Sequence, residues 1–273
     1  MIREKLLMYD RFNRQINYLR ISVTDRCNLR CTYCMPEEGI TQLDHSEILS
    51  FEEIASFTRI AATKGFNKVR ITGGEPLVRK GVVELVSMIS NIEGITDLSM
   101  TTNGVLLGKY AKELKYAGLQ RVNVSLDTVN PTRYRQITRV GSLDDVLNGL
   151  ECARAAGLTP IKINCVVDKS SAEPDAVEVK KFAQANGFEV RFIPKMDLNA
   201  GIFGEVEGGN GGNCSICNRL RLTANGFVKP CLFSNLGYSI RGLGYEGALL
   251  KAVNAKPARG TTNHDGKFYN IGG

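Results

Sequence analysis

Short apolar segments alternate along the chain with longer segments in which apolar residues recur at helical spacing. Clusters of apolar and β-branched residues predict strands at 19–24, 68–72, 97–101, 121–126, 161–167 and 189–193. Helices are predicted between them, at 51–64, 82–89, 109–117, 143–156 and 176–186. Ser50 and Glu53 are spaced for a capping box at the first of these helices. This alternation predicts an α/β fold with a parallel sheet and right-handed crossovers.

The pattern leaves two architectures open for this sheet. It is either open and doubly wound or an incomplete (β/α)6 barrel. Ligands bind at the carboxyl ends of the strands in both architectures. We therefore expect the chemistry-bearing residues to lie in the loops that follow the strands.

Composition changes after Met196. Six of the 12 residues from Gly201 to Gly212 are glycine, which indicates a flexible linker. We therefore predict a main domain at 1–197, a glycine-rich linker at 198–213 and a smaller C-terminal region at 214–273. That region shows one helical segment, at 247–254, so it needs a bound metal or docking onto the main domain for stability.

Charge and hydropathy exclude some classes of protein. No apolar run approaches the roughly 20 residues of a membrane span, and no secretory signal is visible, so we predict a cytoplasmic protein without membrane contact. In that compartment the eight cysteines indicate metal binding rather than disulfides. Thirty-five basic against 28 acidic residues give a net charge of +7, which suits nucleic acid, a nucleotide or another phosphorylated molecule.

Two groups of three cysteines carry the candidate chemistry. The first cysteine group (Cys27, Cys31 and Cys34) directly follows the first predicted strand, and the second cysteine group (Cys214, Cys217 and Cys231) lies in the C-terminal region. Three thiolates can bind a [4Fe–4S] cluster and leave one iron open for a small molecule. Zinc is the alternative, although structural zinc sites prefer four ligands. The other two cysteines, Cys152 and Cys165, fit buried thiols in a helix and a strand.

Arg219 and Arg221 lie between the cysteines of the second group. Two arginines two residues apart on an extended segment point the same way and can fork a phosphate chain. A solvated strand face is the other interpretation of this pair.

The first cysteine group, with Tyr33 before its last cysteine, resembles the signature of radical S-adenosylmethionine (SAM) enzymes. The segment 72–76 (TGGEP) is similar to the GGEP motif of that family. In the family the open iron chelates SAM, and an electron from the cluster cleaves it to release a 5′-deoxyadenosyl radical. The resemblance implies that Tyr33, Gly73, Gly74 and Glu75 contact SAM.

Three further segments resemble one branch of the family, which cyclises GTP in molybdenum cofactor biosynthesis: 19–28 (LRISVTDRCN), 217–223 (CNRLRLT) and 271–273 (IGG). The resemblance implies an incomplete parallel (β/α)6 barrel with a small C-terminal iron–sulfur extension. It implies two [4Fe–4S] clusters, one per cysteine group, and the product (8S)-3′,8-cyclo-7,8-dihydroguanosine 5′-triphosphate.

The same resemblance assigns residues to each ligand. Ser125 and Met196 join the SAM contacts. Gly272 and Gly273 become a catalytic tail that threads into the site. The residues that match GTP contacts are Arg20, Arg70, Thr101, Lys162, Arg191, Arg219, Leu220 and Arg221.

Partners also follow from the resemblance. It implies an external one-electron reductant and contact with the next enzyme of the pathway, cyclic pyranopterin monophosphate synthase, and it is compatible with a homodimer. Two other functions stay open: a peptide-maturing radical enzyme with an auxiliary cluster, and a non-enzymatic iron–sulfur or zinc protein that binds nucleic acid. Only 17 residues separate Met196 from Cys214, fewer than is usual in the branch.

Overall fold

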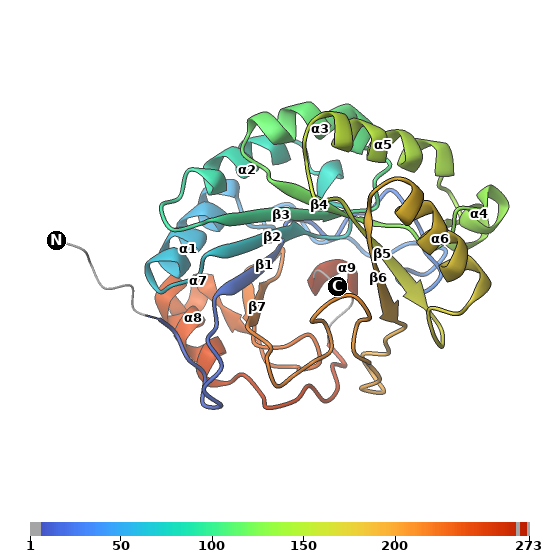
Figure 1. Cartoon of the computed structure of the whole chain (residues 1–273). Coiled ribbons are helices and arrows are strands. Elements are labelled where there is room, and N and C mark those ends of the chain that lie inside the picture. The colour runs from blue at the N-terminus through green and yellow to red at the C-terminus, as the bar shows by residue number, and fades with distance from the viewer. Residues whose placement is uncertain (1–6, 266–267, 272–273) are drawn as a thin grey trace.

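In the computed structural model, which describes residues 7–265 and 268–271, nine strands form one curved sheet with helices on its convex face (Figure 1). Six of them pair in parallel, in the order β6-β5-β4-β3-β2-β1. They are β1 (Tyr18–Ser22), β2 (Lys68–Thr72), β3 (Asp97–Thr102), β4 (Arg121–Ser125), β5 (Lys162–Val167) and β6 (Glu189–Pro194). The six predicted strands are confirmed. Their parallel pairing and the curvature agree with a partial barrel.

Helices connect these strands. They are α1 (Phe51–Thr63), the short 3-10 helix η1 (Pro76–Val78), α2 (Val82–Ser90), α3 (Leu107–Tyr116), α4 (Pro131–Thr138), α5 (Leu143–Ala155) and α6 (Pro174–Ala185). The capping box of Ser50 and Glu53 is present at the start of α1. Helix α4 escaped prediction because it buries only Tyr134 and Thr138 and so shows no apolar stripe. Its local signals were Asn130, which accepts a hydrogen bond from the Arg133 amide, and Pro131 in the first turn.

The C-terminal region continues the same sheet. Strand β7 (Arg219–Leu222) pairs in parallel with β1, and β8 (Phe227–Lys229) and β9 (Tyr238–Ser239) follow as antiparallel strands. The predicted helix at 247–254 appears as α8 (Tyr245–Asn254), preceded by α7 (Ile240–Leu243) and packed against α1. The last helix, α9 (Phe268–Ile271), lies inside the curve of the sheet (Figure 1). The division of the chain at 197 and 213 stays a prediction.

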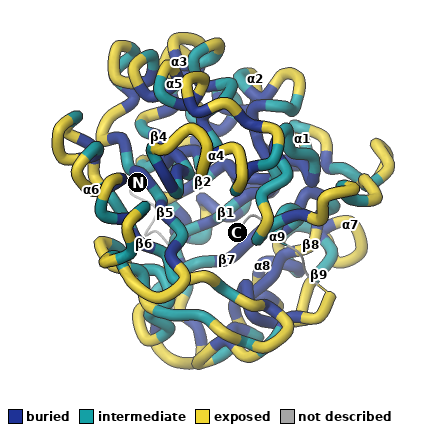
Figure 2. The backbone as a smooth tube through the Cα atoms, turned by 90° about the vertical axis from the view of Figure 1, so that its right-hand side faces the viewer, coloured by how far each residue is buried: buried dark blue, intermediate teal, exposed yellow. Residues whose placement is uncertain are grey.

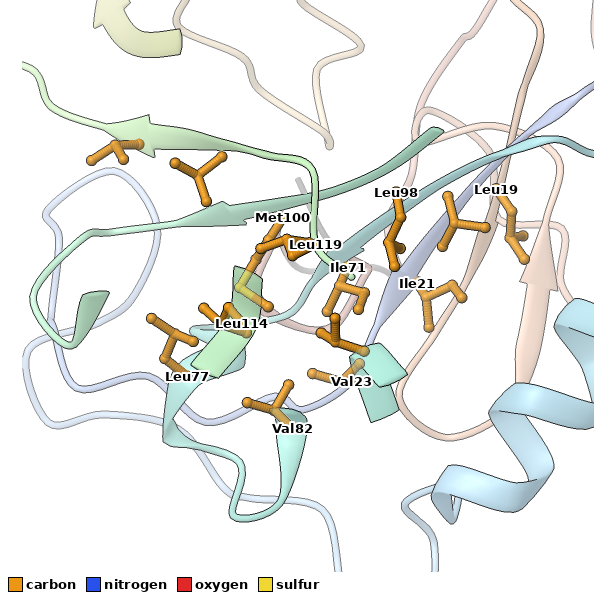
Figure 3. Packing of buried hydrophobic residues seen from close by; sticks show 14 of the residues in the cluster. Leu19, Ile21, Val23, Ile71, Leu77, Val82, Leu98, Met100, Leu114 and Leu119 are labelled. Atoms are coloured by element: carbon orange, nitrogen blue, oxygen red, sulfur yellow. The ribbon is translucent and has the colours of Figure 1, made fainter. Parts of the chain in front are cut away.

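The two faces of the sheet differ in polarity. On β1, Leu19 and Ile21 point towards the helices and pack with Ile71, Leu98 and Met100 from the neighbouring strands (Figure 3). Burial is therefore concentrated on the strands and the inner sides of the helices, whose outer turns are exposed (Figure 2). Because strand residues alternate between faces, the residues between these apolar positions line the concave side. That side is largely polar and holds the candidate site.

The glycine-rich link packs along β6, which is one edge of the sheet. Glu207 forms an antiparallel bridge with Phe192 of β6, and Ile202 forms one with Asp197. A Cβ atom on Gly212 would lie 2.0 Å from the carbonyl oxygen of Gly204, and one on Gly201 would lie 2.2 Å from that of Thr261. These glycines permit close backbone packing, whereas the sequence had suggested only a flexible linker.

Candidate active site

The first cysteine group lies in the long loop between β1 and α1, which we call the cluster loop (residues 23–50). The turn after β2 ties down its beginning, because the Gly74 amide donates to Thr24 O over 2.7 Å and the Glu75 amide to Arg26 O over 2.8 Å. The end of α4 holds its middle. There Arg139 Nη1 donates to Arg30 O over 2.8 Å and to Met35 O over 3.0 Å. The loop is thus fixed on two sides by hydrogen bonds to its backbone carbonyls, from the amides after β2 and from the Arg139 side chain.

The three thiols of the first cysteine group converge. Burial raises the pKa of all three, and Cys34 next to Cys27 reaches about 12. The nearby Cys34 and Cys27 thiols raise the pKa of Cys31 further. Asn103 Nδ2 and the Leu29 amide point at Cys27 Sγ, over 3.9 and 3.4 Å, which suits a negatively charged sulfur. Three converging, largely buried thiols fit a bound cationic centre, which would hold them as thiolates.

A hollow of about 510 Å³ opens beside this group. Cys34 borders it together with two predicted SAM contacts, Tyr33 and Met196. The Tyr33 hydroxyl donates to Asp127 Oδ2 over 2.7 Å, and the other oxygen of that carboxylate accepts from the Val166 amide over 2.8 Å. Asp127 follows β4 and was not singled out from the sequence, although its position after a strand was a usable signal.

A second cavity, also of about 510 Å³, occupies the concave side of the sheet. All three cysteines of the second cysteine group line it, and so does Met196, which borders both hollows. Five predicted substrate contacts line it as well: Arg20, Arg70, Arg191, Arg219 and Arg221. Strands and loops far apart in sequence therefore bring the two cysteine groups to the same side of the sheet.

Four arginines form one row across this cavity. Arg221, Arg20 and Arg70 are register partners on β7, β1 and β2, and the row continues through Ser99 to Arg121 on β4. Like charges directly opposite one another in a sheet are unfavourable. Burial lowers the pKa of Arg20, and the nearby arginines lower it further. The same two causes lower the pKa of Arg221 to about 10. We call these four residues the arginine row.

Acidic residues do little to offset this charge. Within the described part of the chain Asp97 is the one carboxylate that lines the cavity, and Arg121 binds it over 2.6 Å. Several polar atoms nearby are buried without a partner among the described residues: Tyr18 Oη, Thr101 Oγ1, Arg191 Nε and both amide atoms of Asn123. Buried polar groups normally have hydrogen-bond partners. The positive charge and these unpaired atoms together indicate a site for a polar, multiply charged anion.

Comparison with known proteins agrees with this geometry. The pattern of the Radical SAM superfamily matches residues 21–183. A protein of Thermodesulfovibrio yellowstonii named GTP 3′,8-cyclase is 42% identical over 311 residues, covering 94% of this chain and 96% of that protein. A protein of the same name from Heliobacterium modesticaldum is 42% identical over 305 residues, with 92% and 93% coverage. The chain belongs to the radical SAM superfamily and, within it, to the GTP 3′,8-cyclase family.

Two further findings bear on the radical SAM fold. The SAM-bound crystal structure of Streptococcus suis SuiB matches with a TM-score of 0.66 at 17% identity, covering 91% of this chain and 66% of that one. This likeness confirms the fold, a partial barrel. The alignment with the Thermodesulfovibrio relative spans 311 positions, more than the 273 residues of this chain, so part of that relative has no counterpart here. The short link between Met196 and Cys214 fits this difference.

Some of the predicted contacts do not line either cavity. Thr101, Ser125 and Lys162 lie on β3, β4 and β5 but line neither hollow, and Lys162 forms an ion pair with Glu189. Leu220 is fully buried and packs in the core, because alternation on β7 turns it away from the two arginines that flank it. Gly272 and Gly273 lie outside the described residues. These assignments stay predictions.

Glu75 of the GGEP motif contacts protein rather than open space. It is 1% exposed. Its Oε1 accepts hydrogen bonds from the Leu77 amide and the Thr102 hydroxyl, and its Oε2 accepts one from the Asn103 amide over 2.7 Å. Asn103 in turn contacts Asn28 and Cys27. Glu75 therefore ties the GGEP turn to β3 and, through Asn103, to the first cysteine group.

Glu75 should make the unfolding free energy of the chain depend on pH, and a Glu75→Gln variant should lack this dependence. Burial raises its pKa from 4.5 to about 7, so the unfolded chain ionises more readily than the folded one. The stability present below about pH 4.5 is then lost as the pH rises to about 7, by roughly 3 kcal/mol relative to the variant. Urea unfolding of both cluster-free proteins between about pH 5 and 8 would measure this. A constant difference in unfolding free energy would contradict it.

The two glycines of the motif are required by the cluster loop. A Cβ atom on Gly74 would lie 2.4 Å from Arg26 O, and one on Gly73 would lie 2.8 Å from Thr24 O. Both obstacles are backbone atoms, which cannot move without displacing the loop. The predicted SAM contact of these glycines thus stands beside a packing role that the structure shows directly.

Gly74→Ala is therefore expected to lose the iron of the first cluster and SAM cleavage with it. The added methyl group must push the segment just before Cys27 out of place. Iron and sulfide per chain, together with 5′-deoxyadenosine formation, would show the loss. Gly247→Ala in α8 is the matched control, because its Cβ would meet only Leu243 Cβ at 3.7 Å. Full iron content and normal cleavage in Gly74→Ala would rule out the packing role.

Proposed function

We propose that this chain converts GTP to the 3′,8-cyclised nucleotide of molybdenum cofactor biosynthesis, using SAM and two [4Fe–4S] clusters. The observation that carries the proposal is the arginine row beside the second cysteine group. A triphosphate carries several negative charges, which suits four arginines that share one row of the concave face. Relatives about 40% identical over most of the chain, all named for this reaction, support the same function.

The cysteines fit the clusters by their chemistry. The first cysteine group would hold the cluster that binds SAM, and the second would hold the cluster nearer to the nucleotide. When bound, the first cluster supplies the electron that cleaves SAM and yields a carbon radical able to remove hydrogen from the ribose. No three His, Cys, Asp or Glu side chains within 7–265 and 268–271 are grouped to hold a single metal ion. In a [4Fe–4S] cluster, by contrast, each cysteine binds a different iron.

The chain itself positions the two ligands. Arg20, Arg70 and Arg221 would bind the triphosphate in the concave face, and the fixed cluster loop would hold SAM at the ends of the strands. Met196 borders both hollows, so it lies where the ribose of the nucleotide and SAM would meet. The polar atoms left unpaired on Thr101 and Asn123 offer hydrogen bonds on the same face. Holding both ligands in one orientation is how such a site accelerates a reaction between them.

Other features of the proposed function stay predictions. They are the external one-electron reductant, contact with cyclic pyranopterin monophosphate synthase, a homodimer, a cytoplasmic location and the catalytic role of Gly272 and Gly273.

None of the helices formed by the described residues has the length and apolar character that crossing a membrane requires.

The test is anaerobic reconstitution with iron and sulfide, followed by incubation with SAM, a reductant and GTP. We expect GTP to increase 5′-deoxyadenosine formation above the uncoupled rate seen without it, together with a product that has the mass of GTP but a new carbon–carbon bond. ATP in place of GTP serves as the control for the base. If the rate of SAM cleavage is the same with and without GTP, the protein is still a radical SAM enzyme, but GTP is not its substrate.

The alternatives are less well supported. The superfamily and family matches favour an enzyme over a nucleic-acid-binding protein. The likeness to SuiB, at 17% identity, shows the fold alone and gives no support to a peptide-maturing activity.

A further inference from the structure

Lys256, just after α8, is a buried cation at the second cysteine group. It is 2% exposed and lines the cavity. Its Nζ donates to Arg219 O over 2.7 Å and to Pro230 O over 2.9 Å. Each carbonyl belongs to a segment that carries a cysteine of the group, because Arg219 follows Cys217 and Pro230 precedes Cys231. One ammonium group thus joins the two segments.

The charge of Lys256 has no carboxylate partner. No ion pair with an acid is formed by this lysine among residues 7–265 and 268–271. The groups close enough to interact with its charge include the sulfurs of Cys217 and Cys231, which a bound cluster would hold as thiolates. An ammonium group has three donors, and the two carbonyls take two of them. A lysine this buried is rare unless it is paired, so its environment must supply negative charge.

A second cation lies beside the same cysteines. Arg219 Nη2 lies 3.7 Å from the Cys217 sulfur. Arg219 and Lys256 both line the cavity together with Cys214, Cys217 and Cys231. The second cysteine group therefore has two cationic side chains as neighbours.

We propose that Lys256 is a positioning residue for the second cluster: it fixes the segments that carry Cys217 and Cys231 and compensates the cluster's negative charge. This inference rests on the second cluster of the proposed function. A cluster bound by three thiolates is anionic and becomes more so on reduction. A nearby cation stabilises the reduced form more than the oxidised form, and it does so strongly in a buried site. Lys256 thus makes the second cluster easier to reduce than it would otherwise be.

The experiment compares Lys256→Met, which removes the charge, with Lys256→Arg, which keeps it. Lys251→Met, an exposed lysine on α8, is the matched control. All are made in the full chain with Cys27, Cys31 and Cys34 replaced by serine, so that only the second cluster is observed. The midpoint potential is measured by redox titration with electron paramagnetic resonance. We expect a more negative potential for Lys256→Met and an unchanged one for Lys251→Met.

Each other outcome has a defined meaning. An unchanged potential in Lys256→Met with an intact cluster overturns the proposal. If Lys256→Met binds no iron, retention of iron by Lys256→Arg supports the role of charge, whereas loss in both variants overturns it. If the parent chain with an unaltered Lys256 binds no iron, the second cluster itself is refuted, and the proposed function loses that cofactor.

Discussion

Replacing Arg221 with methionine should weaken GTP binding about 100-fold while SAM cleavage without GTP continues at nearly its original rate. Arg221 is 7% exposed, lines the cavity and is the register partner of Arg20. Removing one buried partner of an ionic hydrogen bond costs a few kcal/mol, mostly because the other charge is left unpaired. Here that other charge is the triphosphate. The first cysteine group lies on a different loop and should be untouched.

Arg221→Met is a sharper test than a change at Arg219, which also contacts the sulfur of Cys217. GTP affinity by equilibrium dialysis and 5′-deoxyadenosine without GTP are the two measurements. Arg154→Ala is the matched control, since this exposed arginine on α5 forms its ion pair with Glu151 of the same helix. Equal loss of both quantities in Arg221→Met would contradict the separation of the two sites.

Much of the fold could be predicted because its strands follow a simple rule. Apolar residues such as Leu19 and Ile21 mark one face of a strand, and the intervening glycine and polar turns mark its ends. The capping box at Ser50 was equally local. Helix α4 and strand β7 were harder, because the helix has little apolar surface and β7 finds its partner, β1, some 200 residues away in the chain.

The site shows the same contrast between local sequence signals and long-range contacts. Motif spacing located the cysteines, and strand alternation predicted that Arg219 and Arg221 share a face, which the cavity confirms. Arg139 and Lys256 could not be found in this way, and for Asp127 the signal was its position after a strand. Each acts through backbone atoms or residues distant in sequence: Arg139 through the carbonyls of the cluster loop, and Lys256 through those of two separate segments. Such contacts exist only once the chain is folded.

The glycines show how a correct observation can have a different physical cause. Glycine at 73 and 74 was expected to let the backbone approach a ligand, yet the nearest obstacles are the carbonyls of the cluster loop. Glycines between 201 and 212 suggested flexibility, yet Gly201 and Gly212 permit backbone contacts too close for any Cβ atom. A glycine in a sequence shows that a side chain is absent, and only the fold shows which neighbouring group packs in its place.

Cys31→Ser and Cys231→Ser should separate the two halves of the chemistry, and they carry the largest expected change in activity. Cys31→Ser removes a ligand of the first cluster, so SAM cleavage should be lost completely, with or without GTP. Cys231→Ser leaves the cluster loop intact, so cleavage should persist without formation of the cyclised nucleotide. Serine is a poor substitute for thiolate at iron, which is why each change should lose one cluster and not merely weaken it.

Cys152→Ser is the control for any general effect of losing a thiol. Cys152 lies on α5, far in sequence from both cysteine groups, where it packs against the core and its sulfur donates to Asn148 Oδ1 over 3.8 Å. It should keep all of the iron and the full activity. Iron per chain and the ratio of 5′-deoxyadenosine to cyclised product distinguish the three variants. If the two clusters have separate roles, SAM cleavage must persist in Cys231→Ser. Loss of cleavage in that variant would mean that the second cysteine group is also needed for SAM cleavage.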